Sequence, residues 1–382
     1  MAKLWRLLGG IVIGVAILNV LHFAFKTPPR STNGRIPSLR TVTSIRKAGI
    51  ATREELQCED ITPQCGVWAA ADECHKNVGF MLSTCKASCG ICDVHLWNDG
   101  PVGSTVELSS GALMPRVGFG TAGLGSLAKA STEQALRVGY RHIDSAQSRL
   151  WYREDLVGAA VKESKISRKD LFLTSKLHPA DLGYNSTMRK FDISLRELGT
   201  NYLDLFLLHY SKCWDSVCEK GISQEGTWED SWEALEELVR QGKVKDIGVS
   251  NFSIDELARL LNIARVPPSV VQSHSDVLSA NSLLQKYCKM HGIQFVAYSS
   301  LGTQHTQTSP GQNPVLTNPV VMDLAKKLRV SPAQIVLRWG LQQGQVVIPR
   351  SSNEHRVREN LDLFSFTLDR EAMVRLDTLD VS

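Results

Sequence analysis

The chain has little excess charge of either sign. Its 43 lysine and arginine residues and 39 aspartate and glutamate residues leave a formal net charge of +4 over 382 residues. Much of the basic excess falls between Lys26 and Arg53, in a stretch that we expect to be a solvated linker. Because nucleic acids are bound by concentrated positive charge, we expect no nucleic-acid partner.

The chain also lacks the glycine-rich turn that opens a dinucleotide-binding Rossmann domain. Its nearest candidate, Gly118-Phe-Gly-Thr-Ala-Gly123, is followed neither by a helix start nor by an acidic residue at the expected distance. The contents of hydrophobic residues, 43%, and of charged residues, 21%, are ordinary for a globular protein. The sequence therefore predicts a folded chain and argues against a Rossmann domain.

One long apolar run, at 7–25, is just long enough to span a bilayer. Its end does not look like a signal-peptide cleavage site, because positions 21–26 are mostly bulky rather than small. We therefore expect a short tail at 1–6, an uncleaved transmembrane signal anchor at 7–25 and a basic linker at 26–57. Positive charge lies on both sides of the run, so it does not set the orientation.

Cysteine is scarce except in one short stretch. So short a segment cannot bury enough apolar surface to fold unaided, and covalent cross-links are expected to stabilise it. Zinc is the alternative, since Cys89 and Cys92 have ligand spacing, but a second such pair is lacking. We expect disulfides, which imply an oxidising compartment, and no metal site. The stretch holds six of the nine cysteines, namely Cys58, Cys65, Cys74, Cys85, Cys89 and Cys92.

Residues 58–92 resemble the ShK-toxin-like (ShKT) domain, both in cysteine spacing and in neighbours such as Trp68 and Asn77. The Lys-Tyr pair of channel-blocking members is lacking, so we expect a spacer or binding module whose partner is unknown. Spacing alone leaves the cysteine pairing open. The pairs that the resemblance implies are Cys58 with Cys92, Cys65 with Cys85 and Cys74 with Cys89.

From about Ser104 the sequence alternates short apolar runs with amphipathic segments that begin at helix caps. Ser253 with Glu256, and Ser331 with Gln334, match the capping box. Eight such units within 104–382 predict an α/β fold, a (β/α)8 TIM barrel, rather than an open sheet. The strands are expected at 117–120, 142–144, 171–176, 203–209, 246–251, 270–272, 293–298 and 345–349.

Polar residues close several of these runs, where a barrel carries its chemistry. Reduction of a carbonyl places negative charge on its oxygen, so the site needs a proton donor beside positive or hydrogen-bonding groups. A tyrosine whose pKa is lowered by a lysine can donate the proton, an aspartate can hold that lysine, and a histidine can orient the carbonyl. Asp144, Lys176 and His209 supply three of these parts.

Residues from about 106 to 380 resemble the aldo-keto reductase family. The resemblance gives Asp144, Lys176 and His209 places in the catalytic tetrad. It implies NADPH-dependent reduction of a small-molecule aldehyde or ketone to an alcohol. The segments that carry it are 139–146, 171–176, 202–209, 232–238, 242–244, 247–252, 298–302 and 348–351.

The tyrosine of the tetrad departs from the family pattern. Most members have it five residues after the aspartate, where this chain has Arg149, and counting back from Val157-Gly158 leads to Trp151. A short insertion would bring Tyr152 into the pocket, and we take Tyr152 as the proton donor. The alternative is that Tyr152 only packs, and that the barrel is an NADPH-binding sensor or partner-binding protein.

The resemblance also implies a site for NADPH. At the nicotinamide end, the matching residues are Ser250, Asn251, Gln272 and, for stacking, Tyr298, followed by Ser299 and Leu301. At the adenosine end, they are Arg350, Ser351 and Arg356 for the 2′-phosphate, and Glu359 and Asn360 for adenine. Two arginines and a hydroxyl suit a dianionic phosphate, so NADPH is expected over NADH.

An anchor followed by disulfides predicts a single-pass type II membrane protein, with the barrel in the secretory-pathway lumen or outside the cell. Asn185-Ser-Thr187 is then an N-glycosylation sequon in an expected loop, whereas Asn251-Phe-Ser253 would face the cofactor pocket. Cys213 and Cys218 flank a loop at the expected substrate mouth, and the sequence leaves open whether they form a bridge.

Overall fold

The computed structural model of the chain describes residues 58–94, 96, 102–148, 150–214, 217–218, 224–308 and 311–380. The predicted tail at 1–6, anchor at 7–25 and basic linker at 26–57 lie outside these residues. Within the described part, no helix combines the length and the apolar composition that a membrane crossing requires.

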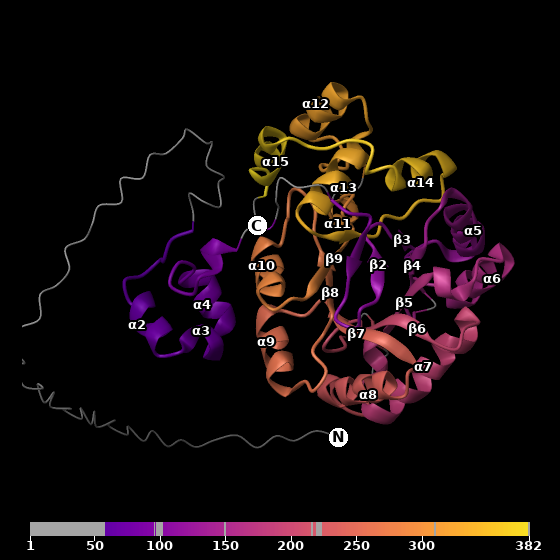
Figure 1. Ribbon diagram of the computed structural model, residues 1–382, viewed down its shortest axis with the longest axis horizontal. Helices are drawn as coiled ribbons and strands as arrows, with labels where there is room; N and C mark the ends of the chain where they lie inside the picture. The colour runs from indigo at the N-terminus through magenta and orange to yellow at the C-terminus, as the bar shows by residue number, and fades with distance from the viewer. Residues whose placement is uncertain are drawn as a thin grey trace, which may run out of the picture. The chain divides into compact units, whose positions relative to one another are not determined.

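Eight parallel strands curl into a barrel (Figure 1). They are β3 (Phe119–Gly120), β4 (His142–Asp144), β5 (Phe172–Leu177), β6 (Leu203–Leu208), β7 (Val244–Ser250), β8 (Val270–His274), β9 (Gln294–Tyr298) and β10 (Val346–Val347). Each strand pairs with the next one along the chain. The barrel closes where Val117 bridges to Val347, and the amide of Gly118 donates to the Val347 carbonyl over 2.8 Å. The predicted barrel is confirmed.

Amphipathic helices cover the outside of the strands, with their apolar side chains in the main core. They are α5 (Ala128–Val138), α6 (Glu154–Ser164), α7 (Tyr184–Leu198), α8 (Trp228–Arg240), α9 (Ile254–Ile263), α10 (Ser282–Met290), α13 (Pro332–Gln342) and α14 (Glu354–Leu361). The two capping boxes expected from the sequence begin α9 and α13, and a third, at Thr227, begins α8. Local sequence therefore determines where α8, α9 and α13 start.

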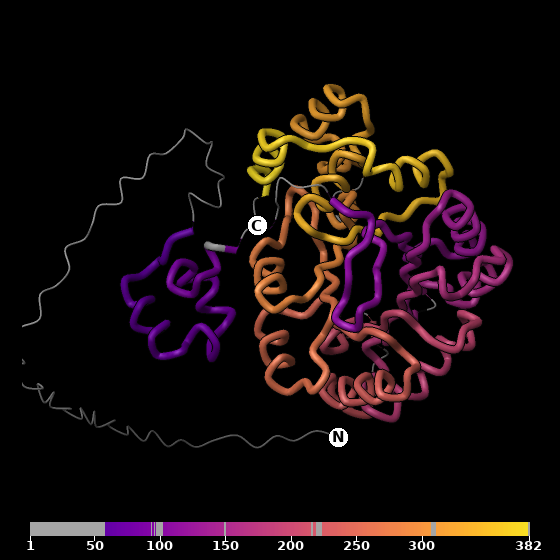
Figure 2. The backbone as a smooth tube through the Cα atoms, in the orientation of Figure 1, coloured from indigo at the N-terminus to yellow at the C-terminus, as the bar shows by residue number. Residues whose placement is uncertain are grey.

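A hairpin that the sequence did not reveal closes one end of the barrel (Figure 2). Its strands are β1 (Thr105–Glu107) and β2 (Leu113–Pro115), which pair antiparallel. Leu108 and Met114 pack among the apolar residues inside the barrel. The Ser110 hydroxyl donates to Asp246 near the start of β7. The hairpin thus covers the amino ends of the strands and leaves the carboxyl ends for a site.

Three further helices complete the barrel domain. They are α11 (Thr303–Thr308), α12 (Pro319–Leu328) and α15 (Arg370–Asp377). Helices α12 and α15 pack with α13 through a second apolar cluster that includes Leu324, Trp339 and Met373. The indole of Trp339 also donates to Asp377 over 2.7 Å. Helix α11 directly follows β9 and therefore lies at the carboxyl end of the barrel.

The cysteine-rich segment folds into short helices around a small centre of Cys65, Met81 and Cys85. The helices are α2 (Cys65–Ala70), α3 (Glu73–Lys76) and α4 (Val78–Thr84), followed by a 3-10 turn at Ile91–Asp93. Disulfides supply the stability that so small a core lacks. They join Cys58 to Cys92, Cys65 to Cys85 and Cys74 to Cys89, the pairs implied by the ShKT resemblance.

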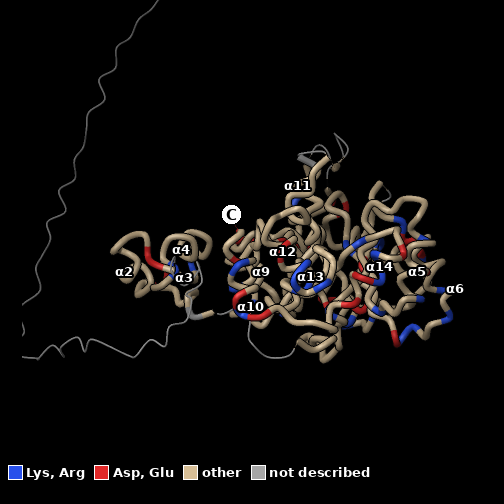
Figure 3. The backbone as a smooth tube through the Cα atoms, turned by 90° about the horizontal axis from the view of Figure 1, so that it is seen from above, with Lys and Arg blue, Asp and Glu red and all other residues tan. Residues whose placement is uncertain are grey.

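Charged residues of both signs are interspersed on the barrel helices (Figure 3). Many are paired at the surface, as where Lys129 of α5 lies 3.2 Å from Glu133 and 2.8 Å from Glu163. Exposed pairs of this kind contribute little to the stability of a fold, because water and salt screen them. Both signs of charge therefore occur together on the surface that this view shows.

Candidate active site

A cavity of about 520 Å³ opens at the carboxyl end of the barrel. The strands deliver its polar residues: Asp144 ends β4, Ser250 ends β7 and Tyr298 ends β9. Lys176 lies near the end of β5 and reaches the site through Asp144. The residues predicted from the sequence that line the cavity are Asp144, Tyr152, His209, Ser250, Asn251, Gln272, Tyr298, Ser299, Leu301 and Arg350.

Lys176 and Asp144 form a buried ion pair at the cavity. Nζ of Lys176 lies 2.6 Å from Oδ1 of Asp144 and 2.9 Å from the carbonyl oxygen of Ser145, and both charged side chains are at most 3% exposed. Nε2 of Gln272 donates to Oδ2 of Asp144 over 2.8 Å. Charge-assisted hydrogen bonds are strong where burial excludes water and the effective dielectric constant is low. Asp144 therefore fixes the positions of both Lys176 and Gln272.

Tyr152 reaches the cavity from the loop between β4 and α6. Backbone bonds hold this loop, since the Tyr152 amide donates to the Ser148 carbonyl and the Trp151 carbonyl accepts from the Gly123 amide, each over 2.6 Å. The centre of the Tyr152 ring lies 5.4 Å from Nζ of Lys176 and 6.0 Å from the ring centre of His209. The structure thus places Tyr152 with the other tetrad candidates. Position 149 lies outside the described residues.

The electrostatics at Tyr152 differ from those expected from the sequence. We expected Lys176 to lower the pKa of the phenol. Instead burial raises the pKa of Tyr152, and the negative charge of Asp144 raises it further. The Lys176 ammonium is bonded to Asp144, which reduces its effect on the ring. Tyr152 is therefore protonated at neutral pH, the form that can donate a proton.

His209 is neutral in this site. Burial lowers the pKa of its imidazole well below the ordinary value, and the nearby Lys176 and His178 lower it further. Its Nδ1 atom is buried without a hydrogen-bond partner, and its ring stacks on Tyr210 with centroids 5.1 Å apart. A neutral imidazole can donate one hydrogen bond to a carbonyl oxygen. His209 is therefore suited to orient a carbonyl substrate.

Polar side chains at the ends of β7, β8 and β9 offer both donors and acceptors. Nδ2 of Asn251 donates to the Ser250 hydroxyl over 3.0 Å, and the Tyr298 hydroxyl donates to Oδ1 of Asn251 over 2.7 Å. Asn251 has a positive φ of 59°, a conformation that asparagine tolerates better than most residues. A carboxamide needs this mixture of partners, and the aromatic ring of Tyr298 lies beside it. These residues fit the nicotinamide end of a cofactor.

Basic residues lie before and within α14, and one of them, Arg350, lines the cavity. Arg350 stands at the rim, while Ser351 follows it and the exposed Arg356 lies in the first turn of α14. Guanidinium groups near a helix amino terminus suit an anionic phosphate. Glu359 and the buried Asn360 lie further along the same helix. The chemistry of these residues fits a phosphorylated adenosine.

An aromatic wall that the sequence did not identify borders the cavity. It consists of Trp151, Tyr210 and Trp214. The rings of Tyr210 and Trp214 pack edge to face, with their centroids 4.6 Å apart. Cys213 and Cys218 are paired in the same segment, with Cα atoms 5.9 Å apart. The sequence alone did not decide whether these two cysteines form a disulfide. The bond lies in the loop that carries Trp214 and Val217, both of which line the cavity.

A buried carboxyl group lies behind the ion pair. Glu154, the first residue of α6, accepts hydrogen bonds from the hydroxyls of Ser175 and Ser194. Burial raises the pKa of Glu154 to about 7, although the two hydroxyls oppose this effect. Sequence reasoning missed this residue, because an acidic residue in the first turn of a helix is usually solvated.

The Asn185 sequon lies in the first turn of α7 rather than in the loop expected from the sequence. Helix α7 begins at Tyr184, directly after Gly183, and Asn185 is exposed. The hydroxyl of Thr187 is buried and donates to the Gly183 carbonyl over 2.7 Å. The second sequon, at Asn251, faces the cavity as expected.

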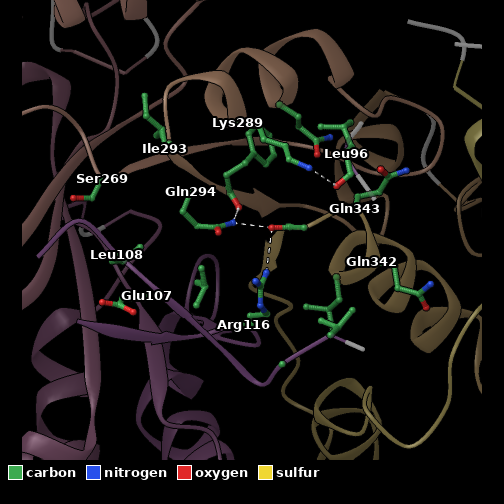
Figure 4. A pocket seen from close by; sticks show the side chains of 18 residues that line it. Leu96, Glu107, Leu108, Arg116, Ser269, Lys289, Ile293, Gln294, Gln342 and Gln343 are labelled. Atoms are coloured by element: carbon green, nitrogen blue, oxygen red, sulfur yellow. Dashed lines mark hydrogen bonds between the residues drawn. The ribbon is translucent and has the colours of Figure 1, made fainter. Parts of the chain in front are cut away.

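A second cavity, of about 380 Å³, lies at the amino end of the barrel (Figure 4). Arg116 and Gln294 both donate to the Gly344 carbonyl, over 3.2 and 2.9 Å, and Lys289 donates to the Leu96 carbonyl over 3.5 Å. These donors hold backbone segments together. The cavity contains none of the residues predicted to act in catalysis or cofactor binding.

Two family models match the chain. Residues 116–381 match the Aldo/keto reductase family, and residues 57–92 match the ShK domain-like family. The first match spans the whole barrel from β3 onward, and the second coincides with the disulfide-bonded segment. Both resemblances noted in the sequence are confirmed.

Known proteins resemble the barrel over most of their own length. Glyoxal reductase of Bacillus subtilis is 39% identical over 278 residues, which are 72% of this chain and 92% of that protein. An aldo/keto reductase structure from Brucella melitensis has 35% identity and a TM-score of 0.64, covering 72% of this chain and 99% of that chain. An aldo-keto reductase of Bombyx mori in complex with NADP has 27% identity and a TM-score of 0.67, covering 74% and 94%.

Proposed function

The chain belongs to the aldo/keto reductase family, and on that premise we propose that it reduces aldehydes or ketones to alcohols with NADPH, using Tyr152 as the proton donor. One observation carries the proposal: Asp144, Tyr152 and His209 line the same cavity as the residues suited to a nicotinamide. The family uses NADP(H), and the Bombyx mori relative is in complex with NADP.

The chain's own residues would divide the work of carbonyl reduction. NADPH, when bound, supplies the hydride. Neutral His209 donates a hydrogen bond that orients the carbonyl oxygen, and Tyr152 transfers its phenolic proton to that oxygen as negative charge develops there. Lys176, held by Asp144, stabilises the phenolate that remains on Tyr152.

The cofactor would be held at both ends by side chains of the last four strands and α14. Ser250, Asn251 and Gln272 bind the carboxamide, and Tyr298 packs on the nicotinamide ring beside Ser299 and Leu301. Arg350, Ser351 and Arg356 bind the 2′-phosphate, whose two negative charges favour NADPH over NADH. Glu359 and Asn360 contact adenine.

The test is NADPH oxidation by the full-length chain in detergent, with a panel of aldehydes and ketones that includes glyoxal. Tyr152→Phe is expected to lower turnover by about 100- to 10,000-fold, the usual contribution of a positioned general acid, while NADPH affinity is unchanged. Tyr184→Phe, on the exposed first residue of α7, is the matched control and keeps full activity. Turnover that survives in Tyr152→Phe would remove Tyr152 from the mechanism.

A sensor function is the second candidate, and the electrostatics of Tyr152 favour it. The raised pKa of its phenol makes proton release harder, and the Lys176 ammonium is bonded to Asp144. A protein of this kind binds NADPH and responds to it without turnover. Tight binding of NADPH by the wild-type chain, with no oxidation on any carbonyl of the panel, would support the sensor and exclude the reductase.

We also propose that the barrel faces the secretory-pathway lumen or the cell exterior, joined to the membrane by residues 7–25. The three bridges of the ShKT module and the Cys213–Cys218 pair support an oxidising compartment. In that compartment the exposed Asn185 becomes an acceptor for N-glycosylation.

A further inference from the structure

Three side chains of metal-ligand type meet beside the cavity. His274 ends β8, Asp276 follows it by two residues, and His305 lies in α11. Nε2 of His274 is 2.8 Å from Oδ2 of Asp276, and Nε2 of His305 is 3.0 Å from the same oxygen. One ligand atom from each residue lies within 4.8 Å of the other two. The loop after β8 and helix α11 are thus joined at one oxygen.

The backbone orients the carboxylate of this trio. Asp276 is fully buried, and its Oδ1 accepts from the amides of Leu278 and Ser279 over 2.8 and 3.2 Å. Its Oδ2 then faces the two imidazoles. Metal-binding carboxylates are commonly held by hydrogen bonds of this kind, which set their direction before the ion arrives. Asp276 is therefore positioned in advance as a ligand.

The donor set suits zinc. Two imidazole nitrogens and one carboxylate oxygen form the protein ligands of known zinc sites in which water takes the fourth position. Bonds of about 2.0–2.1 Å place two ligand atoms about 3.3 Å apart on a tetrahedron. The two distances to Oδ2 of Asp276 would have to lengthen by a few tenths of an ångström, and the two imidazole nitrogens already lie within 4.8 Å of each other. The side chains of His274 and His305 are 21% and 28% exposed, so an ion can reach them.

We propose that His274, Asp276 and His305 bind one Zn²⁺ ion, with water as the fourth ligand, and that the ion ties α11 to the loop after β8. Helix α11 has six residues, too few to be stable alone. Thr303 and Gln304, at its start, line the cavity. The ion therefore fixes part of the cavity wall, and its binding does not depend on the proposed reductase activity.

The test uses the full-length, untagged chain in detergent, with its disulfides intact and bound metal removed by a chelator. Titration with Co²⁺ is expected to give the visible absorption of one tetrahedral ion per chain, which one equivalent of Zn²⁺ then removes. His274→Gln and His305→Gln should each weaken Zn²⁺ binding by about 10-fold or more, because each removes one of three protein ligands. His291→Gln, just after α10, is the matched control and keeps full affinity.

Other outcomes would overturn the proposal. Binding that survives in both His274→Gln and His305→Gln but disappears in His178→Gln would place the ion with the cavity histidines. Failure of the wild-type chain to bind one equivalent of Zn²⁺ would also exclude the site. Circular dichroism of the metal-free variants checks that they fold. If one does not, X-ray absorption of the wild-type zinc complex decides, since fewer than two imidazoles around the ion contradicts the assignment.

Discussion

A buried glutamate beside the catalytic candidates links the stability of this barrel to pH. The folded chain binds the Glu154 proton more tightly than the unfolded chain does, because burial raises the pKa from its ordinary value near 4.5 to about 7. The free energy of unfolding therefore falls as pH rises through that interval and is insensitive to this group on either side of it. Between the acidic and the alkaline side of this interval, Glu154 changes the free energy of unfolding by roughly 3 kcal/mol.

Glu154→Gln is expected to remove this dependence. A glutamine has nearly the same shape and keeps hydrogen bonds to Ser175 and Ser194, whose hydroxyls can reorient. In urea unfolding at pH 5 and pH 8, the variant should lose less stability on going to pH 8 than the wild-type chain, by about 2 to 3 kcal/mol. Glu233→Gln, on the exposed face of α8, should follow the wild type. An unchanged pH response in Glu154→Gln would show that this carboxyl does not titrate as described.

The sequence predicted those site residues whose place follows from their immediate neighbours in the chain. Asp144, Lys176 and His209 were predicted because each closes an apolar run, and a barrel strand carries such a residue to the cavity. Glu154 and the aromatic wall were missed, because burial and ring contacts arise between segments far apart in sequence. The direction of the Tyr152 pKa was wrong for the same reason, since it depends first on how deeply the ring is buried and then on the nearby charge of Asp144.

At the scale of elements, the loop after β6 depends on a covalent link. The bond between Cys213 and Cys218 closes a very short ring next to Trp214, which lines the cavity. Closing so short a ring removes conformational entropy from the flexible loop, which corresponds to roughly 2 kcal/mol of free energy. Without the bond, a substrate that packs on Trp214 would have to order the loop as it binds.

The double variant Cys213→Ser/Cys218→Ser is therefore expected to raise KM for carbonyl substrates by about 10-fold or less, with kcat changed little. Steady-state kinetics of the full-length chain measures both constants. The affinity for NADPH serves as the control and should stay constant, because its proposed contacts lie on β7 to β10 and α14. A KM equal to that of the wild type would show that the bridge does not shape the substrate side.

The strands were predictable and the hairpin was not, for physical reasons. Parallel strands are buried on both faces, so they appear as continuous apolar runs, and the eight runs found in the sequence correspond to β3 to β10. Strands β1 and β2 have three residues each, which is too short for a periodic pattern, and β2 ends at Pro115. Their position is set by Leu108 and Met114 inside the barrel, a contact that no local pattern encodes. The trio of His274, Asp276 and His305 was missed for a similar reason.

At the scale of the whole molecule, the proposed topology makes a clear prediction. In sealed microsomes that contain the full-length chain, added protease should leave the barrel intact, because the barrel is expected in the lumen. Detergent should then expose it to digestion, which serves as the control for protease activity. Immunoblotting of the barrel reads both results. Loss of the barrel in intact vesicles would place it on the cytosolic side and contradict the proposal.

The hairpin that closes the barrel also determines where the preceding chain is attached. Thr105 enters the barrel at the amino ends of the strands, while the cavity opens at their carboxyl ends. A spacer placed before β1 could be lengthened, shortened or exchanged without passing the mouth of the cavity. The barrel is thus suited to immobilisation through its N-terminal side on a solid support, with the opening left free for reagents in a flow reactor.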